Sequence, residues 1–245
     1  MASSDSCCRV VIAALLLTSA CGGRGAKPAI VLFDGRGTSP GDVAAIESIL
    51  NAHHLDYLTA GSWRLNFMTE SQIREHHLLI VPGGNFVSIG KHLSPAATAN
   101  IRSAVRNGMN YLGICAGAFF AGNSPYNGLN LTSGVRFPFY AAESRGIRKA
   151  PLAITMAAGS TLDQYWEDGP QLTGWGAVVA KYPDQTPAIV EGTFGNGWVV
   201  LSGVHPEAEA QWWRGMNFTA PLDADHAYAA SLIEAALNRA PLPHF

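Results

Sequence analysis

Cys115 is the residue whose surroundings point most directly to chemistry. It lies between Gly113 and Gly117, directly after an apolar run that predicts a strand. The G-x-nucleophile-x-G pattern is typical of a nucleophile elbow, a sharp strand-to-helix turn whose flanking positions leave no room for side chains. The N–H groups and partial positive charge at the start of the following helix favour the thiolate. The pattern therefore predicts that Cys115 is a nucleophile.

A cysteine nucleophile needs a partner that moves protons, and His205 is the best candidate. It lies in the stretch Gly203-Val204-His205-Pro206-Glu207, shortly after another apolar run. Pro206 keeps His205 extended, and in extended chain residues two apart point the same way. Glu207 can therefore orient the imidazole, which completes a Cys-His-Glu triad. The alternative is a loop histidine beside a solvated carboxylate.

The oxyanion formed by attack on a carbonyl would need N–H donors. The N–H of Ala116, directly after the nucleophile, is one candidate. The turn Pro82-Gly83-Gly84 follows a neighbouring predicted strand, and Gly84 is the second candidate. The catalytic prediction thus consists of Cys115, His205 and Glu207, with an oxyanion hole formed by Gly84 and Ala116.

The elements that must position these residues follow an α/β pattern. Apolar runs predict strands over residues 29–33, 78–81 and 111–114, and later over 152–156, 177–181, 188–191 and 198–201. Helical spacing and Ser-Pro starts predict helices over 39–55 and 94–107, with a closing helix over 226–239. Alternating strands and helices imply right-handed crossovers and a parallel sheet covered on both faces. No linker divides residues 29–240, which predicts a single domain there.

Composition narrows the possible partners. Only 14% of the 245 residues are charged, the net charge is −2, and no Lys/Arg run occurs. Nucleic acid is not an expected partner, because binding to phosphates needs a clustered basic surface. The pairs His53-His54 and His76-His77 have no acidic cluster beside them, so neither a metal nor any other cofactor is expected. The expected ligand is a small-molecule substrate, and the sequence names no partner protein.

The first residues predict export. Arg9 precedes a short apolar run over residues 10–17, followed by Ser19-Ala20-Cys21-Gly22. This order is typical of a signal peptide, and its end is similar to a bacterial lipobox in which Cys21 becomes lipidated. We expect a signal peptide over residues 1–20, a spacer over 21–28, and a lipid-anchored protein on the extracytoplasmic face of a bacterial membrane. An uncleaved N-terminal helix is the alternative. Cys7 and Cys8 would leave with the signal, making Cys115 the one free thiol.

Three stretches together resemble a known family. They are Leu79 to Gly84, Tyr111 to Phe120, and Gly203 to Glu207, with Gly35 to Gly41 as a further match. They are similar to class I glutamine amidotransferase-like domains, closest to the type at the N-terminus of eukaryotic biotin–protein ligases and in stand-alone bacterial proteins. The resemblance implies a flavodoxin-like α/β three-layer sandwich, and a Cys-His-Glu triad at Cys115, His205 and Glu207.

Two functions are compatible with these residues. The first is a cysteine hydrolase or an acyl or amido transferase that acts on an amide or ester. The second is a small-molecule binding or regulatory module that keeps the fold without catalysis. Thiol reactivity discriminates them, because a catalytic cysteine alkylates rapidly whereas a buried structural cysteine is inert.

Overall fold

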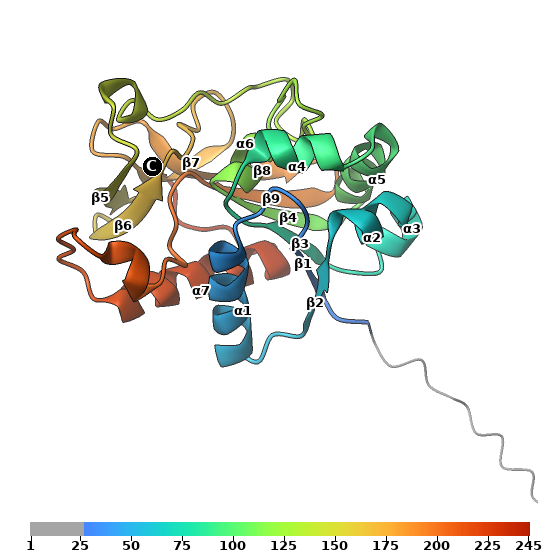
Figure 1. Cartoon of the computed structure of the whole chain (residues 1–245), viewed down its shortest axis with the longest axis horizontal. Coiled ribbons are helices and arrows are strands. Elements are labelled where there is room, and N and C mark those ends of the chain that lie inside the picture. The colour runs from blue at the N-terminus through green and yellow to red at the C-terminus, as the bar shows by residue number, and fades with distance from the viewer. Residues whose placement is uncertain (1–26) are drawn as a thin grey trace, which may run out of the picture.

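The computed structural model describes residues 27–245 (Figure 1). The predicted signal peptide, Cys7, Cys8, Cys21 and the greater part of the spacer lie outside these residues. The strands are β1 (Ile30–Phe33), β2 (Tyr57–Ala60), β3 (Leu78–Val81), β4 (Asn110–Ile114), β5 (Lys149–Met156), β6 (Thr161–Glu167), β7 (Ala177–Lys181), β8 (Pro187–Phe194) and β9 (Gly197–Ser202). The helices are α1 (Pro40–Ala52), α2 (Ser62–Phe67), α3 (Glu70–Ile73), α4 (Phe86–His92), α5 (Pro95–Arg106), α6 (Ala116–Ala121) and α7 (Leu222–Asn238).

All nine strands form one sheet in the order β2-β1-β3-β4-β9-β8-β7-β5-β6. The pairs from β2 to β9 are parallel, and those from β9 to β6 are antiparallel. The predicted flavodoxin-like α/β fold is confirmed, and the antiparallel strands extend its parallel part. Because the chain enters the antiparallel part through hairpins and loops, no helix is needed to cross over there.

Helices cover both faces of the parallel part (Figure 1). One hydrophobic core lies between the sheet and helices α2 to α6, and the other lies between the sheet and helices α1 and α7. In β1, Val31 and Phe33 face the first core, while Ile30 and Leu32 face the second. This alternation of fully buried residues is why the strand is continuously apolar, as predicted.

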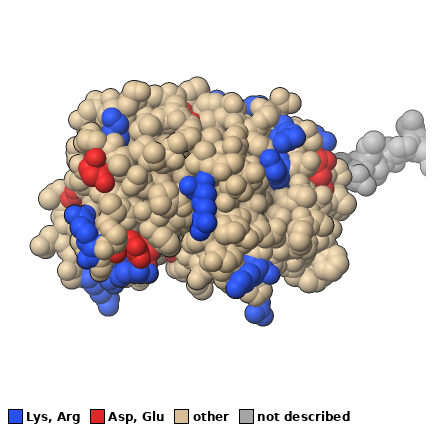
Figure 2. Space-filling view, turned by 90° about the horizontal axis from the view of Figure 1, so that it is seen from above, with Lys and Arg blue, Asp and Glu red and all other residues tan. Residues whose placement is uncertain are grey.

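Helices α1 and α5 begin where the sequence predicts, whereas α7 begins at Leu222, ahead of its predicted start at residue 226. Ser39 caps α1 and Ser94 caps α5, each through its side-chain oxygen and each followed by proline at the first helical position. None of the helices among residues 27–245 is long and apolar enough to cross a membrane. Figure 2 shows a face on which Lys and Arg stand apart from one another among uncharged residues, in keeping with the low charge of the sequence.

Two strands beside the site escaped prediction. Tyr57–Ala60 is the short edge strand β2, and Thr161–Glu167 is β6 at the opposite edge. Both contain polar residues within a short run, so neither gives a continuous apolar signal. The carboxyl ends of β1, β3, β4 and β9 share one edge of the parallel part, where ligand sites of open α/β sheets occur.

Candidate active site

Cys115 lies on the predicted elbow between β4 and α6. Its backbone has φ 47° and ψ −102°, an uncommon conformation for a residue with a side chain. A Cβ on Gly117 would come within 1.9 Å of the carbonyl oxygen of Val81, and one on Gly113 within 2.6 Å of that of Gly117. Glycine is therefore required at both positions, and strand and helix pack tightly enough to hold the strained turn.

Sheet order brings His205 to the cysteine. Strands β4 and β9 are parallel neighbours, and Ile114 pairs with Ser202. Both chains leave the same edge of the sheet, so Cys115 and the loop that carries His205 emerge side by side although they are 90 residues apart. The Sγ atom of Cys115 lies 3.5 Å from the carbonyl oxygen of Glu167, which accepts a hydrogen bond from the thiol.

Glu207 contacts His205 as the sequence predicts. Its Oε1 atom lies 2.9 Å from Nδ1 of His205, and both side chains are buried. The N–H of His205 donates to the carbonyl of Tyr165, which fixes the backbone of the loop. The carboxylate thus lies where it can keep a proton on Nδ1 and leave Nε2 for proton exchange.

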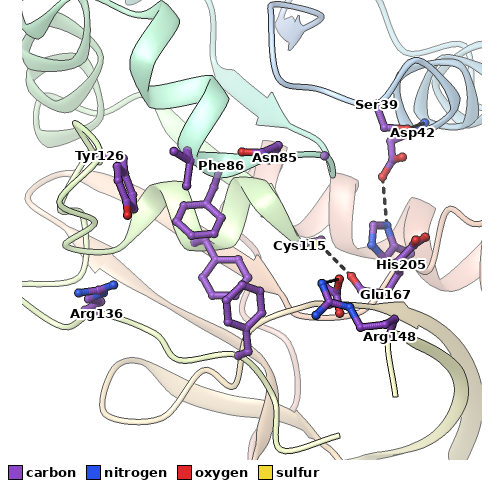
Figure 3. Close-up of a pocket in the computed structure, with 15 residues that line it drawn as sticks. Ser39, Asp42, Asn85, Phe86, Cys115, Tyr126, Arg136, Arg148, Glu167 and His205 are labelled. Carbon is purple, nitrogen blue, oxygen red and sulfur yellow. Dashed lines mark hydrogen bonds and ion pairs between the residues drawn. The ribbon is translucent and has the colours of Figure 1, made fainter. Parts of the chain in front are cut away.

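Asp42 is a second carboxylate on the same ring nitrogen, and the sequence analysis missed it. It lies in the first turn of α1, is 5% exposed, and places Oδ1 3.1 Å from Nδ1 of His205 (Figure 3). A Cβ on Gly83 would lie 2.0 Å from Oδ1 of Asp42 and 2.6 Å from Cε1 of His205. Gly83 therefore makes room for this contact. The available signal was that α1 begins at the carboxyl end of β1, the sheet edge that also carries Cys115.

The electrostatics distinguish the two acids. Burial opposes the charge of Asp42, but its hydrogen bond to His205 and the charge of that ring outweigh burial and lower its pKa. Burial is the dominant effect on Glu207 and raises its pKa. Two carboxylates this close repel each other when both are ionised. The opposite directions of these two shifts make Asp42, at a helix N-terminus, the acid that ionises more readily beside His205.

The surroundings of His205 favour the charged form of its imidazole. Burial lowers the pKa of His205, but the charges of Cys115 and Glu207 and the hydrogen bonds to Asp42 and Cys115 prevail and raise it well above its usual value. Cys115 and His205 line the same cavity. The ligand atoms of Asp42, His205 and Glu207 lie within 4.8 Å of one another, but their hydrogen bonds converge on Nδ1 and favour a proton there over a cation.

The predicted oxyanion donors also lie at this edge. Gly84 lines the cavity beside Cys115, and Ala116 directly follows the nucleophile. Within residues 27–245, no backbone carbonyl accepts a hydrogen bond from the N–H of either residue. Both donors are therefore unengaged by the backbone. Their roles, like those of Cys115, His205 and Glu207, stay predictions.

The site opens into a cavity of about 610 Å³. Cys115, His205 and Asp42 line one end of it, and Glu167 and Arg148 lie beside them (Figure 3). Arg148 pairs with Glu143 and Asp168, which fixes its charge at the rim. Glu167 accepts a hydrogen bond from the hydroxyl of Tyr165 at 2.6 Å. A ligand here would meet a nucleophile, a proton carrier and both signs of charge.

Comparison with known proteins identifies the first half of the chain. Residues 29–147 match the family described as "Biotin-protein ligase, N terminal". The biotin–protein ligase of Schizosaccharomyces pombe is 27% identical over 163 residues, which cover 55% of this chain and 26% of the ligase. A protein from Chlamydia muridarum is 31% identical over 157 residues, which cover 53% of this chain and 60% of that protein. Each alignment spans less than two thirds of the relative.

Solved structures extend the likeness to the whole described fold. A glutamine amidotransferase aligns with 85% of this chain and 98% of its own, with a TM-score of 0.62 and 18% identity. The PurLQS structure from Thermotoga maritima covers 85% of this chain and 99% of its own, with a TM-score of 0.57 and 17% identity. These likenesses concern the fold. The resemblance seen in the sequence is thereby confirmed.

Proposed function

We propose that this chain, a class I glutamine amidotransferase-like protein whose residues 29–147 belong to the biotin–protein ligase N-terminal family, is a cysteine hydrolase or acyl or amido transferase. Its substrate would be an amide or ester. The observation that carries the proposal is that Cys115, on a strained elbow, lines one cavity with His205, on the neighbouring strand's loop. A structural cysteine would need neither the strain nor the buried imidazole.

The first half-reaction would form a thioester. His205 holds the thiol proton, and the thiolate of Cys115 attacks the carbonyl carbon, forming the S–C bond. The carbonyl π electrons move to oxygen, where the N–H groups of Gly84 and Ala116 can donate. When the oxyanion collapses, the C–N or C–O bond breaks, and the leaving amine or alcohol takes the proton from His205.

The second half-reaction would release the acyl group. His205, now neutral, removes a proton from water, and the hydroxide oxygen attacks the thioester carbonyl. Collapse of this second oxyanion breaks the S–C bond and returns the proton to the sulfur, which leaves a free acid. An amine or alcohol in place of water gives a transferase. Asp42 and Glu207 hold His205 by Nδ1 in both steps.

Replacement of the nucleophile tests the proposal. We expect purified wild-type protein to release 4-nitrophenolate from 4-nitrophenyl acetate and the Cys115→Ala variant to lose all of this activity above the rate in buffer. Circular dichroism of the variant should match that of the wild type. Activity that persists in the variant, or none in either protein across a panel of amides and esters, would refute the proposal in favour of a binding module.

A further inference from the structure

Two cavities meet at His205. The larger, of about 610 Å³, is the one that Cys115 lines, and His205 also lines a smaller one of about 310 Å³. Ser39, Asp42, Glu167 and His205 line both, whereas Cys115 lines only the larger. Of the two cavities, the nucleophile Cys115 thus borders the larger alone, whereas the proton carrier His205 borders both.

The larger cavity has an aromatic wall. The ring centroids of Phe86 and Phe119 are 4.6 Å apart, those of Phe119 and Phe139 4.8 Å, and those of Phe86 and Tyr126 6.1 Å. Phe119 lies one helical turn after Cys115, so the wall begins beside the nucleophile. Phe139 and Tyr126 remain 41% and 40% exposed. Aromatic surface left uncovered within a cavity is suited to a flat apolar ligand.

Arg136 adds a charge to this wall. It lines the larger cavity and lies with Tyr126 at the end away from His205 (Figure 3). Among residues 27–245, no carboxylate lies within ion-pair distance of its guanidinium, whereas Arg148 in the same cavity pairs with Glu143 and Asp168. The guanidinium of Arg136 can therefore form an ion pair with an anionic group of a ligand.

The smaller cavity is polar. Lys149, Gln211 and Arg214 line it together with Glu167, and Trp212 packs edge-on against His205 with centroids 5.9 Å apart. Positively and negatively charged side chains that can form hydrogen bonds make this cavity suited to the polar part of a ligand. The two compartments therefore differ in the chemistry that they accept.

We propose that the substrate is bipartite, with an acyl part that carries an aromatic ring and an anionic group in the larger cavity, and a polar leaving group that departs past His205 into the smaller one. This inference rests on the proposed function. The acyl carbon stays bonded to the sulfur, which faces the larger cavity. The leaving heteroatom must take its proton from His205, so it lies against the imidazole and the smaller cavity.

Esters that differ only in the acyl part test the assignment. The probes are 4-nitrophenyl acetate, 4-nitrophenyl 3-phenylpropanoate and 4-nitrophenyl 3-(4-carboxyphenyl)propanoate. In each, the thiolate of Cys115 forms a thioester while the ester C–O bond breaks and 4-nitrophenolate leaves with the bonding electrons. The second-order rate of this burst reports acylation alone, so turnover of an unknown natural substrate is not required.

We expect the phenyl group to raise the acylation rate roughly tenfold over acetate through burial against the wall. The carboxylate should add roughly threefold through Arg136. Arg136→Ala should abolish the threefold gain from the carboxylate and keep the tenfold gain from the phenyl group. Phe139→Ala should reduce the tenfold gain from the phenyl group. Arg145→Ala and Phe67→Ala, exposed residues outside both cavities, should leave all three rates unchanged.

Equal rates for the three esters, or an Arg136→Ala effect that is the same on all three, would overturn the bipartite assignment while leaving the proposed function intact. If no ester gives a burst, the proposed function fails. Whether the larger cavity binds an aromatic anion is then tested separately. The measurement is whether 3-(4-carboxyphenyl)propanoate slows the alkylation of Cys115 by iodoacetamide. Protection that Arg136→Ala weakens supports the cavity, and absence of protection refutes it.

Discussion

The carboxylate of Asp42 lies 3.1 Å from Nδ1 of His205, on the nitrogen that Glu207 contacts at 2.9 Å. One imidazole nitrogen is thus contacted by two buried acids from distant parts of the sequence. Because the pKa of Asp42 is lowered and that of Glu207 is raised, Asp42 is the acid that more readily carries the charge opposite the ring. A triad inferred from the local His-x-Glu spacing assigns that role to Glu207.

Removing the charge of Asp42 should therefore slow the reaction more than removing that of Glu207. Asp42→Asn keeps the shape but loses the charge that faces His205, and we expect the burst with 4-nitrophenyl acetate to slow about tenfold or more, the equivalent of about 1.5–3 kcal/mol for a hydrogen bond to a charged group. Glu207→Gln should slow it less, because the raised pKa of Glu207 makes this carboxyl the weaker source of negative charge beside the ring. A wild-type rate in Asp42→Asn, or a larger loss in Glu207→Gln, would contradict the assignment.

Gly83 provides a steric test of the same contact. A methyl group at this position would lie 2.0 Å from Asp42 and 2.6 Å from His205, so Gly83→Ala must displace one of them. We expect about a tenfold or greater loss of burst rate, because small displacements of catalytic groups are costly. Gly61→Ala is the matched control, since its methyl group would meet an ordinary contact at 3.6 Å from Asp34. Equal activity of the two variants would argue against a role for the Asp42–His205 contact.

A buried acid away from the site, Asp225, makes the stability of the fold depend on pH between about 4 and 8. Burial, with a contribution from the charge of Asp163, raises the pKa of Asp225 to about 8, while Gln164 donates a 2.8 Å hydrogen bond to it. The folded state keeps a proton that the unfolded chain releases above pH 4, so stability falls as pH rises from about 4 to 8. Asp225→Asn should remove this loss and raise the melting temperature at pH 8 relative to the wild type.

At pH 4 and below, where both states hold the proton, the Asp225→Asn variant and the wild type should melt together. Scanning calorimetry at pH 4 and pH 8 makes the comparison. An equal difference between the proteins at both pH values would mean that ionisation of Asp225 does not govern their stability.

Much of this site could be predicted because its signals are local. The elbow at Cys115 needs glycines two positions either side, and His205 and Glu207 lie only two residues apart. The prediction that this segment is extended is wrong after His205, because Pro206 and Glu207 form a turn in which the N–H of Ala208 donates to the carbonyl of His205.

Asp42 and Glu167 could not be found from such local signals, because Asp42 reads as an ordinary first-turn acid and Glu167 ends a strand with a weak apolar pattern. Their proximity depends on the order of strands in the sheet, which no short segment encodes.

The N-terminal residues lead to a prediction of location. We propose that Cys21 is lipidated after cleavage and anchors the protein to the extracytoplasmic face of a bacterial membrane, as the segment 1–21 suggests. In a bacterial host, the wild type should sediment with membranes and resist carbonate extraction, while Cys21→Ser should not. Mass spectrometry of the mature N-terminus checks the lipid. Unchanged fractionation, or an intact residue 1, would exclude the anchor.

The central claim is that Cys115 and His205 form one proton-sharing pair. It is tested most directly by the rate at which iodoacetamide alkylates Cys115 between pH 5 and 9, in the wild type and in His205→Gln. The account predicts a wild-type rate that changes little between pH 6 and 8, because the raised pKa of His205 keeps the proton on the imidazole, and a variant rate that is lower at pH 6 and climbs steadily with pH. Superimposable profiles for the two proteins would contradict it.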